Sequence, residues 1–154
     1  MDAFPPKIGP YVPERLLGRG AMAAVYLCRD AEGEAVAVKW LDDAHHALVE
    51  RFDRECRALA ELDHPSIVGW RDHGSFLGRP YLVMEYVEGT ELRVYIDKLH
   101  RRPPAERYAR CRAIGVELCA ALDHLHAHGL VHRDIKPTNV LMADDGRVVL
   151  SDLG

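Results

Sequence analysis

The spacing of the apolar residues changes along the chain, and this change is the strongest constraint on the fold. From Tyr11 to Leu41 the apolar residues form short runs, several of them β-branched, that glycines interrupt. This pattern predicts three antiparallel strands joined by hairpins. Over residues 44–62 the apolar residues recur every three or four positions, which predicts one amphipathic helix with Asp42 or Asp43 placed to cap its first turn.

The chain then returns to strands before it becomes helical. Residues 67–76 and 81–87 are expected to form two strands around a turn at residues 77–79. Helical spacing covers residues 91–99 and, after a break at two prolines, residues 105–126. Two short strands, residues 140–142 and 148–150, flank an Asp-Asp-Gly turn. Five strands and one helix would complete a small lobe of an α+β fold, with a mainly helical part after it.

Composition and charge exclude several classes of protein. With 48% hydrophobic and 29% charged residues, the 154-residue chain has the composition of a globular protein. Acidic and basic residues are interleaved and the net charge is -4, so no basic stripe is available and nucleic acid is not an expected partner. No apolar run is long enough for a membrane segment, and the N-terminus, which reads as a natural start at Met1, lacks a signal sequence. We therefore expect a cytoplasmic protein.

The four cysteines are Cys28, Cys56, Cys111 and Cys119, and no two of them form a CxxC pair. They lie in apolar, periodic segments, which favours buried thiols in a reducing compartment over disulfides or a zinc site. The histidines at 124, 126 and 128 could suggest a metal site, but a helix places only His124 and His128 on one face. Because a zinc site needs three or four converging ligands, we expect these histidines to be exposed to solvent.

A glycine-rich loop separates the first two predicted strands. It reads Gly18-Arg19-Gly20-Ala21-Met22-Ala23-Ala24-Val25. Two glycines in a hairpin are most often only a turn, yet a loop held between strands can also fold over phosphates and offer backbone N–H groups to them. A dinucleotide-binding loop would open a helix instead.

A lysine stands in an apolar strand after this loop, in Val36-Ala37-Val38-Lys39. Its ammonium is expected to need an anion, and Glu55 lies on the face of the following helix that points back toward the strand. Such a pair would hold the lysine on the phosphates of a nucleotide. Glu50 and Glu61 are alternative partners, and a surface lysine beside an unrelated glutamate is the alternative interpretation.

The segment His132-Arg133-Asp134-Ile135-Lys136-Pro137-Thr138-Asn139 resembles the HRDxKxxN catalytic loop of the protein kinase family. The lysine two residues after the aspartate is typical of serine/threonine kinases, and the spelling resembles the bacterial, Hanks-type branch. Asp152-Leu153-Gly154 follows after a strand–turn–strand and resembles the DFG motif of the family, with leucine in place of phenylalanine. Ala23 replaces the third glycine of the family's phosphate loop.

The resemblance implies a kinase that uses ATP and Mg²⁺ and a protein substrate with serine or threonine. Asp134 would orient or deprotonate the substrate hydroxyl, and Lys136 would steady the γ-phosphate. Asn139 and Asp152 would hold magnesium. His132 is expected to be a packing and hydrogen-bonding residue, and Arg133 to lack the phosphorylated partner that it has in relatives.

The resemblance also places the nucleotide base. The adenine is expected between apolar side chains of both lobes, which on the matching positions are Leu17, Val25, Ala37 and Leu141. Met84 is expected at the back of the pocket, and the backbone of Glu85 and Val87 is expected to pair with the edge of the base. Periodicity alone would assign the apolar members of this set to the core.

By the same resemblance, the chain divides into an N-terminal extension (residues 1–10), the N-lobe and hinge (11–87) and a truncated beginning of the C-lobe (88–154). The activation segment and the later helices are expected to be missing. The stripe formed by Tyr108, Cys111, Leu118, Leu122 and Leu125 should then face water in part.

Three functions remain open at this point. The leading one is a protein serine/threonine kinase whose parent transfers phosphate. The alternative is a pseudokinase-like module or fragment that binds ATP without turnover, which the missing C-terminal part favours. A kinase of small molecules is disfavoured because Lys136 and the His-Arg-Asp spelling are typical of protein-directed kinases.

Overall fold

A computed structural model describes residues 5–43 and 46–152 of the chain. The chain divides into two compact units. The first comprises Met1–Ala60 and Trp70–Tyr86, and the second comprises Glu61–Gly69 and Val87–Gly154. The units are described one after the other.

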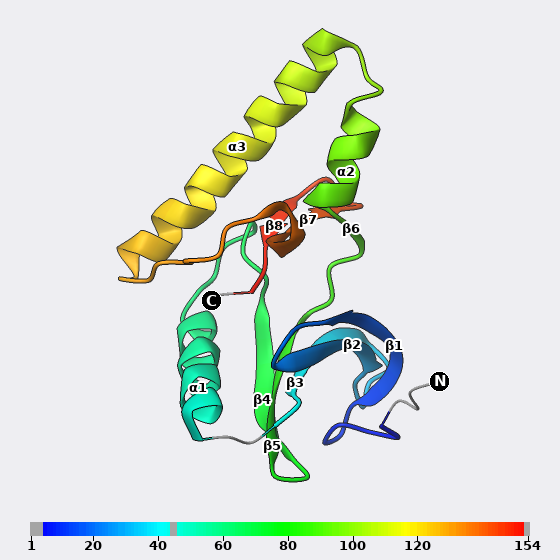
Figure 1. Ribbon diagram of the computed structural model, residues 1–154, viewed down its shortest axis with the longest axis vertical. Helices are drawn as coiled ribbons and strands as arrows, with labels where there is room; N and C mark the ends of the chain where they lie inside the picture. Colours follow the sequence, from blue (N-terminus) through cyan, green and yellow to red (C-terminus); the bar gives the residue numbers. More distant parts are fainter. Residues whose placement is uncertain (1–4, 44–45, 153–154) are drawn as a thin grey trace. The chain divides into compact units, whose positions relative to one another are not determined.

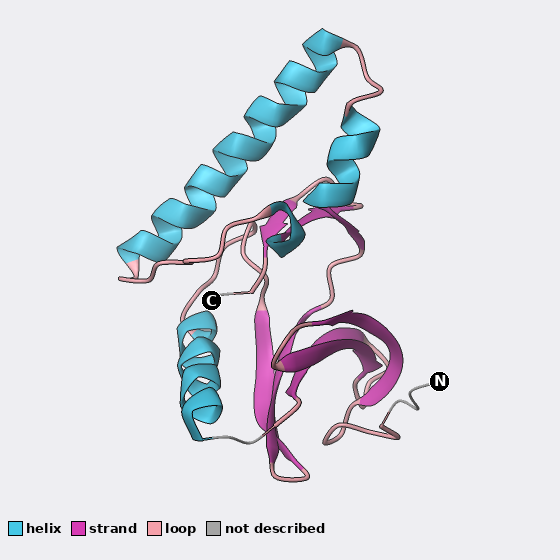
Figure 2. Ribbon diagram, in the orientation of Figure 1, coloured by secondary structure: helices cyan, strands magenta, loops and turns pink. Residues whose placement is uncertain are grey.

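The first unit is a five-stranded antiparallel sheet with one helix (Figures 1 and 2). The strands follow the order β1-β2-β3-β5-β4 across the sheet, and α1 packs beside β4 and β5. This confirms the predicted small lobe. The bounds are β1 Val12–Arg19, β2 Ala23–Arg29, β3 Ala35–Leu41, α1 His46–Ala60, β4 Trp70–Phe76 and β5 Arg79–Glu85.

The register of the strands separates the side chains of this sheet into two faces. Val25 is paired with Lys39, and Ala37 with Met84, so these four residues share one face, because paired residues point to the same side. The opposite face carries a hydrophobic cluster that the N-terminal segment helps to cover. Its members are Ile8, Tyr11, Ala24, Tyr26, Cys28, Val36, Val38, Trp40, Tyr81 and Val83.

The segment before β1 takes part in this core. Ile8 is completely buried and forms an isolated bridge with Tyr11. The hydroxyl of Tyr11 donates a hydrogen bond to Oδ2 of Asp72 on β4, at 2.7 Å. Desolvation by burial, followed by the nearby Asp72, raises the pKa of this hydroxyl well above its ordinary value. The segment is therefore fixed by both packing and a hydrogen bond.

The predicted turn between β4 and β5 is confirmed, but β4 is shorter than expected. Leu77 and Gly78 both have positive φ angles, 52° and 73°, as a tight two-residue hairpin turn requires. Ile67 and Val68, which were expected in this strand, belong to the second unit instead. There Ile67 bridges Leu150, and the N–H of Val68 donates to the carbonyl of Leu150. Both side chains are less than a tenth exposed in the second unit, and this burial favours their place there over an extension of β4.

The second unit contains the two predicted helices and a small antiparallel sheet of order β6-β7-β8. Strand β6 was not predicted. Its first residue, Gly89, has a φ of 158°, and a Cβ atom there would clash with the backbone of Met142 and Ala143, so glycine is required. The bounds are β6 Gly89–Glu91, α2 Leu92–Leu99, α3 Pro104–Ala127, the 3₁₀ helix Pro137–Asn139, β7 Val140–Ala143 and β8 Val148–Leu150.

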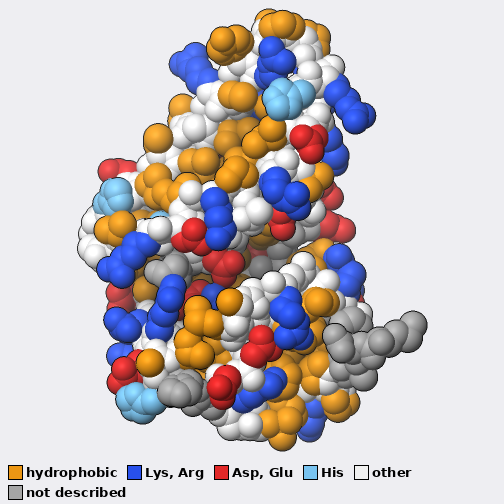
Figure 3. Space-filling model, viewed as in Figure 1, with side chains coloured by type: hydrophobic (Ala, Val, Ile, Leu, Met, Phe, Trp, Pro, Cys, Tyr) orange, Lys and Arg blue, Asp and Glu red, His pale blue; other side chains and the backbone are white. Residues whose placement is uncertain are grey.

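Helix α3 buries only part of its apolar surface. Ile114, Ala121 and Leu125 are buried, whereas Tyr108 is 77% exposed. Figure 3 shows hydrophobic side chains gathered over the helical part of the chain. The expected exposure of the α3 stripe is thus confirmed toward its N-terminal end. Leu118 and Leu122 are half-buried.

The prediction of four buried cysteines is wrong for two of them. Cys28 and Cys56 are buried, but Cys111 and Cys119 lie exposed on α3, and all four thiols are free. The two exposed thiols belong to the part of the α3 surface that no other described element covers, which is why helical periodicity misplaced them. Within the described residues, no helix is long and apolar enough to cross a bilayer.

The cap that Asp42 or Asp43 was expected to provide cannot be located, because residues 44 and 45 lie outside the described residues. The carboxylate of Asp42 has another partner, Arg19, at 2.9 Å. Among the described residues, no group of three or more His, Cys, Asp or Glu is arranged to hold a metal ion.

Candidate functional site

The predicted lysine–glutamate pair is present in the first unit. Nζ of Lys39 on β3 lies 2.7 Å from Oε1 of Glu55 on α1. The two side chains are only 16% and 12% exposed. A lysine and a carboxylate held this close, and this far from solvent, attract more strongly than a surface pair. Of the alternatives, Glu50 lies instead near His46 on the same helix.

The glycine-rich segment forms the connection between β1 and β2, as predicted. The pairing of the two strands continues through Gly18 with Val25 and Arg19 with Ala24. The turn itself is closed by a hydrogen bond from the N–H of Gly20 to the carbonyl of Ala23, at 2.9 Å. The segment is therefore the closed end of the β1–β2 hairpin.

The candidate base-binding positions of the first unit differ in their surroundings. Val25, Ala37 and Met84 share the sheet face that carries Lys39. Ala37 and Met84 are buried, while Leu17 on β1 is 36% exposed. Glu85 is paired with Val36, so its side chain points to the opposite face of the sheet.

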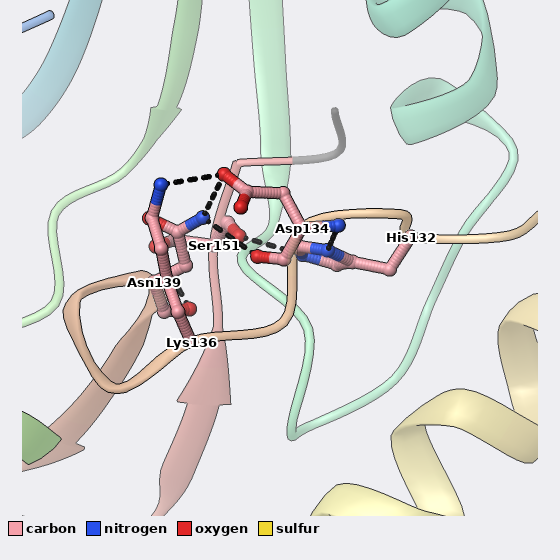
Figure 4. Close-up of polar contacts among 5 residues, drawn as sticks. All are labelled: His132, Asp134, Lys136, Asn139 and Ser151. Atoms are coloured by element: carbon pink, nitrogen blue, oxygen red, sulfur yellow. Dashed lines mark hydrogen bonds and ion pairs between the residues drawn. The ribbon is translucent and has the colours of Figure 1, made fainter.

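The second unit contains the His-Arg-Asp loop, anchored by a buried histidine (Figure 4). His132 is 1% exposed, which confirms that it packs inside the loop. Its Nε2 atom lies 2.9 Å from the carbonyl oxygen of Ser151, and its Nδ1 atom accepts a hydrogen bond from the N–H of Asp134 at 3.3 Å. These partners assign the ring proton to Nε2, since a carbonyl oxygen can only accept.

Three side chains of this loop converge (Figure 4). Lys136 Nζ donates to Oδ2 of Asp134 at 2.7 Å, and Asn139 Nδ2 donates to the same oxygen at 3.0 Å. Asn139 Nδ2 also donates to the backbone carbonyl of Asp134 at 2.9 Å. The hydrogen bond from Lys136, helped by that from Asn139, lowers the pKa of Asp134 against the smaller opposing effect of desolvation. Asp134 is thereby kept ionised.

The position of Asn139 is fixed from both sides. It is buried, and it ends the 3₁₀ helix that begins at Pro137. Its carbonyl accepts hydrogen bonds from the N–H and the hydroxyl of Ser151. Ser151 therefore links both His132 and Asn139 to the segment after β8. Sequence reasoning missed it, because two of the three bonds use the backbone atoms of Ser151, which any residue would supply.

The other expected residues of the second unit lie as follows. Val87 is buried and Leu141 is half-buried. Asp152, expected to hold magnesium, is half-buried and has a positive φ of 52°. A positive φ is uncommon outside glycine, although aspartate adopts it more often than most residues, and such conformations cluster at functional sites. Leu153 and Gly154, the rest of the DFG-like motif, lie outside the described residues.

Comparisons with known proteins agree with this geometry. The family model described as "Protein kinase domain" matches residues 11–154. The "Probable serine/threonine-protein kinase PknB" of Lactococcus lactis is 41% identical, with 90% of this chain and 22% of that protein covered. The "CBL-interacting protein kinase 4" of rice is 42% identical, with 97% of this chain and 34% of that protein covered.

Solved structures give the same result. The kinase domain of PknI from Mycobacterium tuberculosis matches with a TM-score of 0.78 at 32% identity, over 96% of this chain and 60% of that domain structure. The chain thus spans between about a fifth and a third of the two curated relatives named. The motifs, the fold and these matches show that the chain belongs to the protein kinase family and resembles its bacterial serine/threonine branch.

Proposed function

We propose that this chain supplies the ATP-binding and catalytic-loop residues of a protein serine/threonine kinase. Such an enzyme moves the γ-phosphoryl group of ATP to a serine or threonine hydroxyl of a protein. The observation that carries the proposal is the convergence of Lys136 and Asn139 on one carboxylate oxygen of Asp134. The Lys39–Glu55 ion pair in the other unit supports it.

Nucleotide binding is proposed to rest on the residues of the first unit. Lys39, oriented by Glu55, would contact the α- and β-phosphates, and backbone N–H groups of the glycine-rich segment would contact the phosphates as well. Its apolar neighbours on the same sheet face would contact the adenine. In the first unit, the residues proposed for the base are Leu17, Val25, Ala37 and Met84, with the backbone of Glu85 at its edge. The resemblance to the family adds Leu141 and the backbone of Val87, which belong to the second unit.

The residues proposed for magnesium fit a hard cation. Because Nδ2 of Asn139 is bound to two oxygen acceptors of Asp134, the orientation of its amide is fixed and its oxygen is the atom left to serve as a ligand. Asp152 adds a carboxylate, and magnesium takes oxygen ligands of these two kinds. Magnesium, when bound, neutralises the charge of the phosphates.

Asp134 is proposed to receive the proton of the substrate hydroxyl. In the transfer, the hydroxyl oxygen forms a bond to the γ-phosphorus, the bond to the bridging oxygen of ADP breaks, and the hydroxyl proton passes to the carboxylate. Both Lys136 and Asn139 donate to Oδ2, so we assign Oδ1 as the oxygen that faces the hydroxyl. The lowered pKa of Asp134 keeps it in the form that can accept a proton.

Lys136 has a second proposed role beside its bond to Asp134. Its side chain is 51% exposed, so the ammonium is accessible to an additional anion from solvent. A lysine between a carboxylate and the γ-phosphate would offset the charge that develops on the transferred group.

A second candidate function is ATP binding without transfer. The exposed apolar end of α3, with Tyr108 at 77% exposure, favours it, because a catalytic loop depends on well-packed support. Both candidates share the same nucleotide chemistry, and both place the chain in the cytoplasm, where ATP is available. They differ in turnover alone.

The test is a transfer assay on this chain with radiolabelled ATP, magnesium and a serine-rich protein. Asp134→Asn is the diagnostic variant. Asp145→Asn is the matched control, because Asp145 is also an exposed carboxylate held by a cation, Arg147, at 2.8 Å. Label that moves with the parent chain and the control, but not with Asp134→Asn, supports transfer. ATP binding without label in any variant supports the second candidate, and no ATP binding at all contradicts both.

A further inference from the structure

The glycine-rich segment is attached to the end of β3 by a backbone hydrogen bond. The last residue pair between β2 and β3 is Ala23 with Leu41. One residue further, the N–H of Asp42 donates to the carbonyl of Met22 at 2.9 Å. The β2–β3 ladder therefore continues by one hydrogen bond into the loop that would cover the phosphates.

The side chain of Asp42 holds the other limb of the same loop. Oδ1 of Asp42 accepts a hydrogen bond from Nη1 of Arg19 at 2.9 Å. The guanidinium also approaches the hydroxyl of Tyr26 on β2, at the outer limit of 3.5 Å. Arg19 stands between the two glycines of the loop, so its side chain is directed to Asp42 and β2.

Asp42 is itself fixed to the sheet. Its backbone carbonyl accepts a hydrogen bond from Nη1 of Arg79 at 3.1 Å. The guanidinium carbon of Arg79 lies 3.4 Å from the centre of the Trp40 ring, close enough for a cation–π contact. Trp40 is buried and stacks obliquely with Phe76. Asp42 thus connects both sides of the loop, at Arg19 and Met22, to the hydrophobic cluster of the sheet through Arg79.

We propose that Arg19 and Asp42 are positioning residues that hold the glycine-rich loop in the conformation that binds ATP phosphates. The inference rests on the proposed nucleotide-binding function. A glycine-containing loop loses much conformational entropy when it becomes ordered. If ATP binds only one conformation of the loop, its apparent affinity is proportional to the population of that conformation. The Arg19–Asp42 ion pair, which we call the clamp, would raise this population and so strengthen ATP binding without a contact between its side chains and ATP.

The expected effect is modest because the pair is exposed. The side chains of Arg19 and Asp42 are 50% and 37% exposed, and exposed ion pairs are weak. Loss of the pair should therefore weaken Mg·ATP binding about two- to fivefold. The backbone bond from Asp42 to Met22 remains in any side-chain variant.

The test uses the full 154-residue chain, three variants of the pair and one control variant. Asp42→Asn removes one charge with little change of shape, Arg19→Gln removes the guanidinium and its charge, and their combination closes a double-mutant cycle. Glu14→Gln is the matched control, since it breaks the exposed Glu14–Arg29 pair between β1 and β2, at 3.1 Å with similar exposure. Calorimetry measures the Kd for Mg·ATP, and hydrogen–deuterium exchange of residues 18–23 without nucleotide measures loop order.

The proposal predicts that both single variants weaken ATP binding about two- to fivefold and speed exchange in residues 18–23. The double variant should be no weaker than either single one, and Glu14→Gln should match the parent chain. Affinities and exchange equal to those of Glu14→Gln, or a tighter complex, would overturn it. If the parent chain binds no Mg·ATP, the nucleotide-binding proposal fails, while unchanged exchange in residues 18–23 would reject the clamp independently.

Discussion

The ammonium of Lys39 on β3 and the carboxylate of Glu55 on α1 lie 2.7 Å apart, with only 16% and 12% of their side chains exposed. Strand and helix are separate elements of one unit, so this contact reports their correct packing. It also leaves a cation oriented on the sheet face shared with Val25, Ala37 and Met84. The pair is the link between the fold and the proposed binding of phosphates.

Glu55→Gln should destabilise the chain by about 2–3 kcal/mol, because the mostly buried ammonium of Lys39 loses its ion pair with Glu55. Glu14→Gln, which breaks an exposed pair, should cost less than about 1 kcal/mol. Urea unfolding of both variants measures the difference. Equal free energies of unfolding for the two variants would show that the Lys39–Glu55 pair contributes no more than a surface pair.

Asp134→Asn should lower any phosphoryl transfer by this chain about 10²- to 10⁴-fold, the range for loss of a positioned general base. Mg·ATP affinity should change little, because Asp134 is proposed to act on the substrate hydroxyl. Initial rates and calorimetry on the same preparation separate the two effects. A proportionate loss of ATP affinity would assign Asp134 to nucleotide binding instead.

The pKa of the Asp134 carboxyl should lie below that of an ordinary aspartate, chiefly because Lys136 donates a hydrogen bond to it. A lowered pKa keeps the group ionised as the pH falls, so its titration should appear only at more acidic pH than in an unfolded chain. Lys136→Met should move the titration back toward higher pH. Carbon-13 NMR of the carboxyl group measures both, and an unchanged midpoint in the variant would contradict the assigned cause.

His132→Phe should destabilise the second unit by about 1–3 kcal/mol, because the carbonyl of Ser151 and the N–H of Asp134 lose a buried partner. Hydrogen exchange should quicken around residues 132–139 and 151. His126→Phe, at an exposed position of α3, is the control. Unchanged exchange in His132→Phe would mean that packing alone holds the loop.

Iodoacetamide should label two of the four cysteines of the folded chain. Cys111 and Cys119 are exposed, whereas Cys28 and Cys56 are buried, and burial raises the pKa of each buried thiol to about 12. Since the thiolate is the reactive form, the buried pair should react only after unfolding. Mass spectrometry with and without denaturant checks this, and rapid labelling of Cys56 in the folded chain would contradict the packing of α1.

Much of this fold follows from patterns that act locally. Short apolar runs interrupted by glycines and turns located the five strands. Spacing of three to four residues located α1, α2 and α3, because each helix buries one face. Strand β6 escaped prediction since Gly89-Thr90-Glu91 has no apolar pattern and is held by its pairing with β7. Ile67 and Val68 were misplaced because an apolar run does not say which of two units it joins.

The candidate site was predictable where residue type carries the chemistry. The resemblance to the family's catalytic loop placed Asp134, Lys136 and Asn139 in one site, and their side chains do converge. Contacts made by backbone atoms were not predictable, as Ser151 shows. The anchoring of the glycine-rich loop by Asp42 was missed for another reason, because a residue before a helix was interpreted as a cap.

The most direct test of the nucleotide-binding claim is the thermal shift of this chain on addition of Mg·ATP, compared with Lys39→Ala. At roughly 100 times the Kd, a ligand that binds only the folded chain should raise the Tm by about 5–10 °C. We predict this rise for the parent chain with magnesium, and little or none for Lys39→Ala. An equal rise for both proteins, or none for the parent chain, would contradict the account.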